Sequence, residues 1–391
     1  MIGARLRQAR LAAGLSLEEL ASRLSRPLTK QAISKYEKGR AEPSASTLMN
    51  LATALGVKPS FLLSEPEVSV DWVAYRKHSS LNARDQEAIT AVATKRLEGE
   101  LPLRRLFNVG LNHSLPRGLA VRDADSVEAA AERVRTEWRL GDSPINGVIE
   151  TIEDHGGIVL SWPAVSGFDG LSGWTNEGAP VMVINEETEV DRRRFDAAHE
   201  LGHLVMSFEV SQDDCEKLAH RFAAAFLVPK SATFRELGNR RRTLSFPELG
   251  LLKQRWGMSM QAWVHRAYDL GIIDASHYGE LNAGFRRRRW HRIEPVRYEG
   301  KEEPMLLRRL VSRAVIEGII SSRDAADICP NYERGYETGR ESELSLRELA
   351  RLPRDERHRI LASAQVEVDV PEVEAWDSAT CHGVDSELAE A

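Results

Sequence analysis

Apolar and polar positions near the start of the chain alternate with the period of an α-helix. Ile2, Leu6, Ala9 and Ala13 recur at helical spacing, and Gly14 follows them. Apolar residues three and four positions apart line one face of a helix, and glycine favours its end. The pattern therefore predicts a helix over residues 2–13.

Three more short helices are predicted before residue 56. The capping box at residues 16–19 starts one helix, and Thr29 caps another that Gly39 ends. A further helix runs from Ser44 to Leu55. Four short helices with a tight turn between the second and third are typical of helix-turn-helix proteins, in which the third helix here would enter the major groove of DNA.

The side chains expected to contact DNA lie in and beside this third helix. Glutamine suits adenine, lysine suits guanine or phosphate, and serine suits any base edge. Residues beyond the helix end are expected to meet phosphates and to set orientation. A small helical dimerisation domain with solvated basic residues is the alternative. The predicted DNA contacts are Thr29, Lys30, Gln31, Ser34 and Lys35, followed by Lys38 and Arg40 at the helix end.

Residues 2–63 contain R-L-R at 5–7, L-E-E-L-A at 17–21, I-S-K-Y-E-K-G at 33–39 and Pro43. With these motifs the segment resembles the Cro/C1-type, or XRE-like, repressors, which implies a lambda-repressor-like bundle. The turn at residues 25–28 is longer than the family usually has, so we expect an altered tilt of the third helix. The resemblance implies a double-stranded DNA operator, read by a homodimer.

The middle of the chain changes from helical periodicity to short apolar runs. Residues 157–162, 170–174 and 181–184 are such runs, separated by Gly, Ser, Asp and Asn, and they predict a small sheet packed on the next helix. Residues 168–174 are a candidate edge strand. Such a strand could pair with an extended substrate chain, and a plain edge hairpin is an equal alternative.

The remaining pattern completes an α+β, mostly helical chain. Helices are expected over residues 81–106, within 251–271 and over 305–320. The predicted organisation is a DNA-binding domain (1–64), a linker with connecting helices (65–124), a middle domain (125–275), a helical C-terminal region (276–360) and a mobile acidic tail (361–391).

Composition restricts the class of protein without deciding its function. A length of 391 residues suggests two or three domains, and 42% hydrophobic with 29% charged residues is ordinary for globular chains. We expect no membrane span and no secretion signal. The three cysteines lie far apart, which favours a reducing cytoplasm over a disulfide scaffold.

The net charge of −6 hides an uneven distribution. Residues 1–63 carry +6 and the remainder carries −12, so a basic module is joined to an acidic body. The four arginines at 286–289 could touch DNA phosphates, although a solvated loop is the favoured interpretation. Residues 361–391 hold eight acidic residues and neither Lys nor Arg, which predicts the mobile tail.

The histidines at 199 and 203 have the spacing of a metal site. Positions i and i+4 share one face of a helix, so His199 and His203 can direct two imidazoles at one ion. Glu200 is placed to act as a general base toward an attacking water. We expect Asp191 to cap this helix. Chance alone gives such a motif in a few per cent of chains like this, so a third ligand must decide.

Glu216 is the predicted third ligand. The apolar stripe of Ala219, Phe222, Ala223 and Phe226 faces inward on the next helix, and Glu216 lies one turn before it. Coordination to a dication would remove the cost of burying this carboxylate. His220 is the alternative ligand, or a donor to the substrate. The expected cofactor is Zn²⁺, bound by His199, His203 and Glu216.

The chain contains R-R-F-D-A-A-H-E-L-G-H at 193–203, E-K-L-A-H-R-F-A at 216–223 and L-V-P at 227–229. Through these motifs, residues 125–275 resemble the ImmA/IrrE family of metallopeptidases. It implies a zincin-like fold, Glu200 in the catalytic position, and repressors of the helix-turn-helix type as substrates. His220 departs from the more usual Asn.

The leading functional hypothesis is a DNA-binding regulator that cleaves a partner repressor or antitoxin with a zinc endopeptidase centre. One rival is a repressor that does not cleave, in which the metal is structural or senses a ligand. Another is one component of a toxin-antitoxin pair that acts through protein contact. Residue pattern alone leaves all three open.

Overall fold

The structure is a computed structural model that describes residues 2–73, 82–110, 115–163, 168–291, 293–330 and 332. The chain divides into two compact units, Met1–Tyr332 and Glu333–Ala391, and the second lies outside the described residues, as does the tail predicted at 361–391. The described part is mostly helical with two small sheets, which confirms the predicted fold class.

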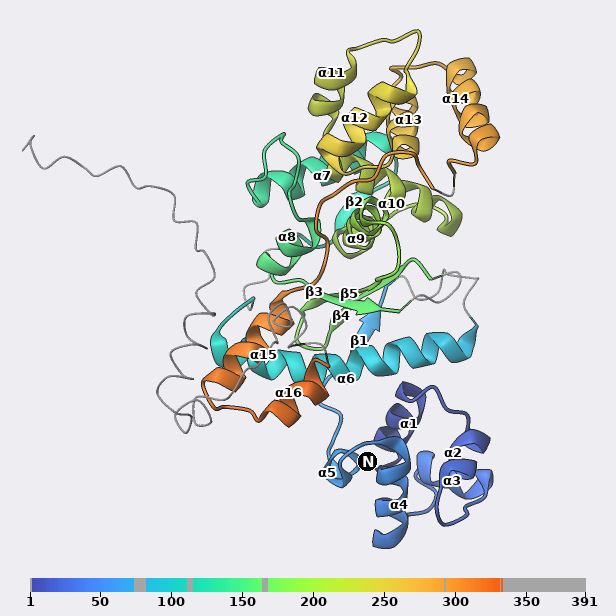
Figure 1. Ribbon diagram of the computed structural model, residues 1–391, viewed down its shortest axis with the longest axis vertical. Helices are drawn as coiled ribbons and strands as arrows, with labels where there is room; N and C mark the ends of the chain where they lie inside the picture. The colour runs from blue at the N-terminus through green and yellow to red at the C-terminus, as the bar shows by residue number, and fades with distance from the viewer. Residues whose placement is uncertain are drawn as a thin grey trace, which may run out of the picture. The chain divides into compact units, whose positions relative to one another are not determined.

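The N-terminal bundle contains the four helices that the sequence predicts and a fifth that it did not. Pro59 occupies the first turn of the fifth helix, a position that favours proline, so its start was legible in the sequence. Leu6, Leu20, Ile33 and Leu51 form the buried centre of the bundle. The helices are α1 (Ile2–Ala12), α2 (Leu17–Arg23), α3 (Lys30–Glu37), α4 (Ala45–Leu55) and α5 (Pro59–Leu63), at the lower end of Figure 1.

The long turn before α3 is held by α4. The side-chain Nδ2 of Asn50 donates to the Arg26 carbonyl at 3.0 Å, and the Ser25 hydroxyl donates to Oδ1 of the same side chain at 2.7 Å. Thr29 caps α3 by accepting from the Ala32 amide, as predicted. The extra turn residues are therefore fixed, and α3 begins at a defined place.

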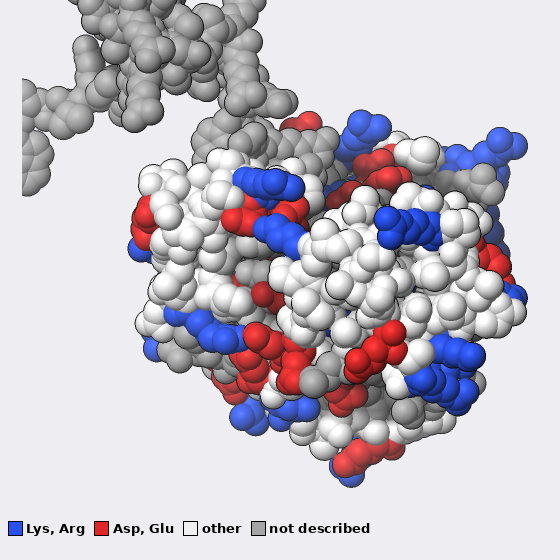
Figure 2. All heavy atoms as spheres, turned by 90° about the horizontal axis from the view of Figure 1, so that it is seen from below, with Lys and Arg blue, Asp and Glu red and all other residues white. Residues whose placement is uncertain are grey.

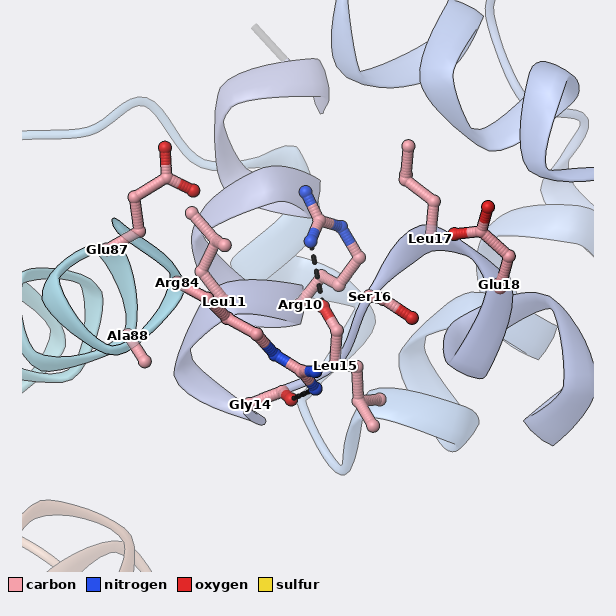
Figure 3. A pocket seen from close by; sticks show the side chains of 10 residues that line it. All are labelled: Arg10, Leu11, Gly14, Leu15, Ser16, Leu17, Glu18, Arg84, Glu87 and Ala88. Atoms are coloured by element: carbon pink, nitrogen blue, oxygen red, sulfur yellow. Dashed lines mark hydrogen bonds between the residues drawn. The ribbon is translucent and has the colours of Figure 1, made fainter. Parts of the chain in front are cut away.

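The long helix α6 (Ala83–Phe107) packs against α1 of this bundle. Arg5 is almost fully buried there and donates to both oxygens of Glu98, at 2.5 and 2.6 Å. A pocket lies between α1, the start of α2 and α6, where Arg84 donates to the Gly14 carbonyl (Figure 3). Hydrogen bonds from side chains of both helices thus fix α1 on α6.

The main sheet has four strands in the order β1-β4-β5-β3. Strand β4 pairs antiparallel with both neighbours, and β3 pairs parallel with β5. The prediction that residues 168–174 form an edge strand is wrong, because β1 covers that edge. The strands are β1 (Val70–Trp72), β3 (Ile158–Trp162), β4 (Gly170–Thr175) and β5 (Pro180–Asn185).

Helices cover both faces of this sheet. On one face, α6 contributes Ile89 and Leu97 to a cluster with Ile158 and Val183. On the other face, Met182 and Ile184 join the larger core formed with α7 (Ala124–Glu137), α8 (Val148–Asp154), α9 (Val190–Val205) and α10 (Gln212–Leu227). A second sheet pairs β2 (Leu119–Val121) with β6 (Met206–Phe208), in parallel. Figure 1 shows α9 above the sheet and α6 below it.

The later helices extend this core and return to α6. The arginines at 286–289 are exposed but belong to the end of a helix, so the predicted loop is wrong while its solvation is confirmed. None of the described helices has the length and apolar character needed to span a membrane. The later helices are α11 (Lys230–Leu237), α12 (Phe246–Trp256), α13 (Met260–Asp269), α14 (Ala275–Arg288), α15 (Leu306–Ile316) and α16 (Ser322–Ile328).

Candidate metal centre

The helix that carries both histidines, α9, is almost wholly buried. Its apolar residues Ala197, Leu201 and Val205 face the large core. The predicted cap, Asp191, is not the N-cap, which is Glu189. Asp191 lies in the first turn and pairs instead with the Lys253 ammonium at 2.9 Å. The carboxylate still stabilises the positive end of the helix from there.

Close packing brings α10 against α9. A Cβ added at Gly202 would lie 2.9 Å from Cδ1 of Phe222, so only glycine permits this distance between the helices. Ala219, Phe222 and Phe226 are buried, which confirms the predicted inward stripe of α10. Glu216, one turn earlier on the same face, is thereby brought to the two histidines.

Three ligand atoms converge between the two helices. The Nε2 atoms of His199 and His203 lie 3.1 Å apart, and the Glu216 carboxylate oxygens lie 3.3 Å from His199 Nε2 and 3.4 Å from His203 Nε2. Tetrahedral ligation with bonds of about 2.0–2.2 Å places ligand atoms roughly 3.3–3.6 Å apart. The two His–Glu distances lie in this range and the His–His distance is 0.2 Å shorter than its lower end, so a small shift of the imidazoles would let the three groups hold a zinc ion, for which their ligand types are suited.

Glu200 lies beside this cluster and is held by the sheet. It is 1% exposed, and the Ser172 hydroxyl of β4 donates to its Oε2 at 2.6 Å. In the absence of a metal, burial raises the pKa of Glu200 to about 8, while the Ser172 hydrogen bond opposes the shift. No local pattern indicates a role for Ser172, because its contact with Glu200 depends on how β4 packs against α9.

The pKa values of Glu216 and His220, which lie beside the two histidines, are also shifted. Hydrogen bonds from His199 and then His203 hold the pKa of Glu216 well below its usual range. Desolvation, followed by the charge of His199, lowers the pKa of His220 to about 4. The His220 ring stacks on Phe195 and lies 4.5 Å from the His199 ring, measured between centroids. Among the described residues, it is not part of the converging ligand set.

Residues far from α9 in the sequence hold this helix in place. No sequence pattern indicated these residues. Glu302 accepts hydrogen bonds from the Val148 and Ile149 amides at the start of α8, at 3.0 Å each, and also pairs with Arg194 of α9. Such buried carboxylates satisfy helix amides and an arginine together. They position α9 without touching the ligand set.

The predicted DNA contacts lie on the accessible surface of the N-terminal bundle. Gln31, Lys35, Lys38 and Arg40 are exposed, and Ser34 is partly exposed. Lys30 is exposed too, but it forms an ion pair with Glu18 of α2 at 2.5 Å. The end of the molecule seen in Figure 2 mixes Lys and Arg with Asp and Glu, and does not present one continuous basic field. DNA contacts there would depend on individual side chains of α3.

Comparison with known proteins separates the chain into two matched parts. Residues 6–62 match the helix-turn-helix family, and residues 158–268 match the IrrE N-terminal-like domain. A similar curated protein is the SPbeta prophage-derived uncharacterized HTH-type transcriptional regulator YonR of Bacillus subtilis (strain 168). It is 39% identical over 71 residues, which are 18% of this chain and 64% of that protein. The match therefore covers less than two thirds of the length of this relative.

Proposed function

Starting from a chain that joins a helix-turn-helix segment to an IrrE N-terminal-like domain, we propose that it is a DNA-binding transcription regulator with a zinc-dependent endopeptidase centre. Its proposed partners are a double-stranded DNA operator and a protein that it cleaves, a helix-turn-helix repressor or an antitoxin. The observation that carries the peptidase half is the convergence of His199, His203 and Glu216 beside Glu200.

The residues of this centre divide the chemistry between them. When bound by the three ligands, zinc supplies Lewis acidity toward a water molecule and toward the scissile carbonyl. Glu200 takes the proton of the attacking water and passes it to the leaving amine. Ser172 keeps the Glu200 carboxylate directed into the site through its hydrogen bond. The buried surroundings strengthen both interactions, because few water dipoles compete with them.

The DNA-binding half is supported by the geometry of α3. The helix packs on α1 and α2 through its apolar side, of which Ile33 is fully buried. Its other side leaves Gln31 and Lys35 exposed, where they can reach base edges in a major groove. Lys38 and Arg40 follow the helix end and are exposed for phosphate contacts.

The test of the peptidase half compares the wild-type chain with Glu200→Gln. Both proteins are loaded with zinc and incubated with the purified products of the neighbouring genes, and fragments are identified by mass spectrometry. The proposal expects cleavage by the wild type only, with equal zinc content in both. Cleavage at equal rates by the two proteins, or zinc binding with no cleavage of any candidate, would reject the peptidase and favour a structural or sensing metal.

A further inference from the structure

Strand β4 is the part of the sheet that lies directly against Glu200. Ser172 donates to one oxygen of the Glu200 carboxylate. A Cβ added at Gly170 would lie only 2.6 Å from the other oxygen, so that glycine is required for the close approach of strand and helix. A peptide that paired with the outer edge of β4, in place of β1, would therefore pass next to the proposed catalytic residue.

That edge of β4 is taken by the chain itself. Residues 67–73, named here the edge segment, run antiparallel along β4 from Asn176 back to Ser172. The Asn176 side chain fixes one end by accepting from the Ser69 amide at 3.1 Å and donating to the Glu67 carbonyl at 3.0 Å. At the other end, the Val73 amide donates to the Ser172 carbonyl at 2.9 Å.

The contact between the two strands is close and leaves no space for another chain. A Cβ added at Gly173 would lie 2.6 Å from the Asp71 carbonyl oxygen and 2.9 Å from Cγ1 of Val70. The outer side of β4 therefore accepts one strand at a time. Between the two described ends of the pairing, no donor or acceptor of β4 is left for an incoming peptide, since antiparallel pairs exchange bonds at alternate residues.

We propose that the edge segment occupies the place where an extended protein substrate pairs with β4, so that a substrate has to displace it. That the displacing peptide is a substrate rests on the proposed peptidase function, but the exchange of strands at this edge does not. Strand addition to a sheet edge is a common way to bind an extended peptide, because the backbone supplies the hydrogen bonds. The edge segment thus acts as an internal competitor of the substrate.

The edge segment is short and has one face in solvent and one face on the core. Its regular part, β1, is three residues long, and the side chains of Asp71 and Val73 are exposed. On its other face, Val68 is buried in the core under the sheet, at 4% exposure, and Val70 and Trp72 pack partly buried against the same core. A strand of three residues at the edge of a sheet opens at lower cost than the longer strands inside it.

The N-terminal bundle is tied to the start of this segment. Arg5 of α1 donates to the Ser64 carbonyl at 3.3 Å and also to the Glu65 carbonyl, while it pairs with Glu98 of α6. Only Pro66 separates these carbonyls from the edge segment. Displacement of the segment must therefore move the residues that Arg5 holds, which couples the DNA-binding bundle to access at β4.

The experiment measures strand exchange in the full-length protein, with a chelator present so that cleavage plays no part. The probe is a fluorescein-labelled peptide with the sequence of residues 67–73, and binding is followed by fluorescence anisotropy. The test variant is Val73→Pro, which removes the amide that bonds Ser172. Its matched control is Val73→Ala, which shortens the same 40% exposed side chain but keeps the amide.

We expect the Kd of the peptide for Val73→Pro to be about tenfold lower than its Kd for the wild type or for Val73→Ala. The reason is that the edge segment of Val73→Pro has lost one hydrogen bond to β4 and competes less well with the peptide. Equal binding to all three proteins would overturn the proposal. Amide hydrogen exchange of the wild type gives a second test that needs no variant. The amides of Val73 and Asn176 should exchange faster than those between β4 and β5, and exchange at the same slow rate would also overturn the proposal.

Discussion

The Ser172 hydroxyl donates a 2.6 Å hydrogen bond to Oε2 of Glu200, and so connects the sheet to the proposed catalytic residue. Ser172→Ala removes this bond and lets the carboxylate turn. We expect the rate of partner cleavage to fall on the order of 10- to 100-fold while zinc content stays the same, because positioning errors of about 1 Å have effects of that size. Metal analysis and cleavage rates measure the two quantities.

Thr175→Ala is the matched control for this change. Thr175 lies on the same strand and is also buried, but its hydroxyl accepts from the Ala179 amide and does not contact Glu200. Its loss should leave the cleavage rate within about threefold of the wild type, as the metal centre is untouched. A larger loss of rate in Thr175→Ala than in Ser172→Ala would show that the hydroxyl of Ser172 has no special role.

Metal binding is predicted to depend on Glu216 but not on His220. Glu216→Gln should weaken zinc binding by more than about 100-fold, which exceeds the effect typical of residues outside the ligand set. His220→Ala should keep zinc affinity within about tenfold, since its ring lies beside His199 without joining the ligand atoms. Competition with a fluorescent zinc chelator measures both affinities. A reversed order would assign the third ligand to His220.

Removal of the metal should destabilise the wild type and leave a ligand variant unaffected. A ligand that binds the folded state alone stabilises it by about 4 kcal/mol when present at 1,000 times its Kd. A chelator should therefore lower the Tm of the wild type but not that of His199→Ala, in scanning calorimetry. Equal shifts in the two proteins would place the stabilising ion elsewhere.

Measurements of DNA affinity should distinguish a base contact in α3 from a phosphate contact just after its end. Arg40→Ala should reduce the slope of log affinity against log salt by about 1, because each phosphate contact releases counterions. Gln31→Ala should keep the slope and lose about 1–3 kcal/mol of discrimination at one base pair. The DNA is an operator selected from random sequences. If both variants changed only the slope, Gln31 would be a phosphate contact.

Local patterns in the sequence identified most helices, and they pointed to His199, His203 and Glu216, which the structure brings together. The ligands sit at i and i+4 on α9 and on the inward stripe of α10, so the period of the helix places them without knowledge of the fold. The strands β3, β4 and β5 followed from their apolar runs. The start of α5 was missed although Pro59 marks it.

What the sequence did not reveal depends on contacts between distant segments. The edge segment alternates Val68, Val70 and Trp72 with polar residues, which is the period of a strand, yet its partner lies a hundred residues away. For that reason β4 was interpreted as an edge. The interactions of Ser172 with Glu200 and of Glu302 with Arg194 likewise join residues that no local period relates.

The contact of the N-terminal bundle with α6 is predicted to depend on Arg5. Arg5→Ala leaves the half-buried Glu98 carboxylate without its partner and frees the carbonyls of Ser64 and Glu65. Loss of one member of a buried pair costs about 3–5 kcal/mol. Arg7→Ala, which breaks the exposed pair with Glu87, should cost less than about 1 kcal/mol. Urea unfolding compares them, and equal costs would mean that the bundle is not fixed on α6 in solution.

Stability should fall as the pH rises from 5 to 8, in part because of Glu153. This α8 carboxylate accepts hydrogen bonds from the Met305 and Leu306 amides at the start of α15. Burial, and then the nearby charge of Glu100, raise its pKa to about 7, while Arg104 and the two amide hydrogen bonds oppose the shift. The folded state therefore holds the proton more tightly than the unfolded chain does, so the stabilisation is complete below the unfolded pKa and is lost as the pH rises through 7.

Glu153→Gln tests this dependence, because glutamine stays neutral and can still accept from an amide. The difference in unfolding free energy between pH 5 and pH 8, measured in urea, should be smaller for Glu153→Gln than for the wild type. Glu150→Gln on the same helix is the control, since Glu150 is exposed and should leave the difference unchanged. An unchanged pH dependence in Glu153→Gln would mean that Glu153 is ionised throughout this range and that the amides of α15 outweigh its burial.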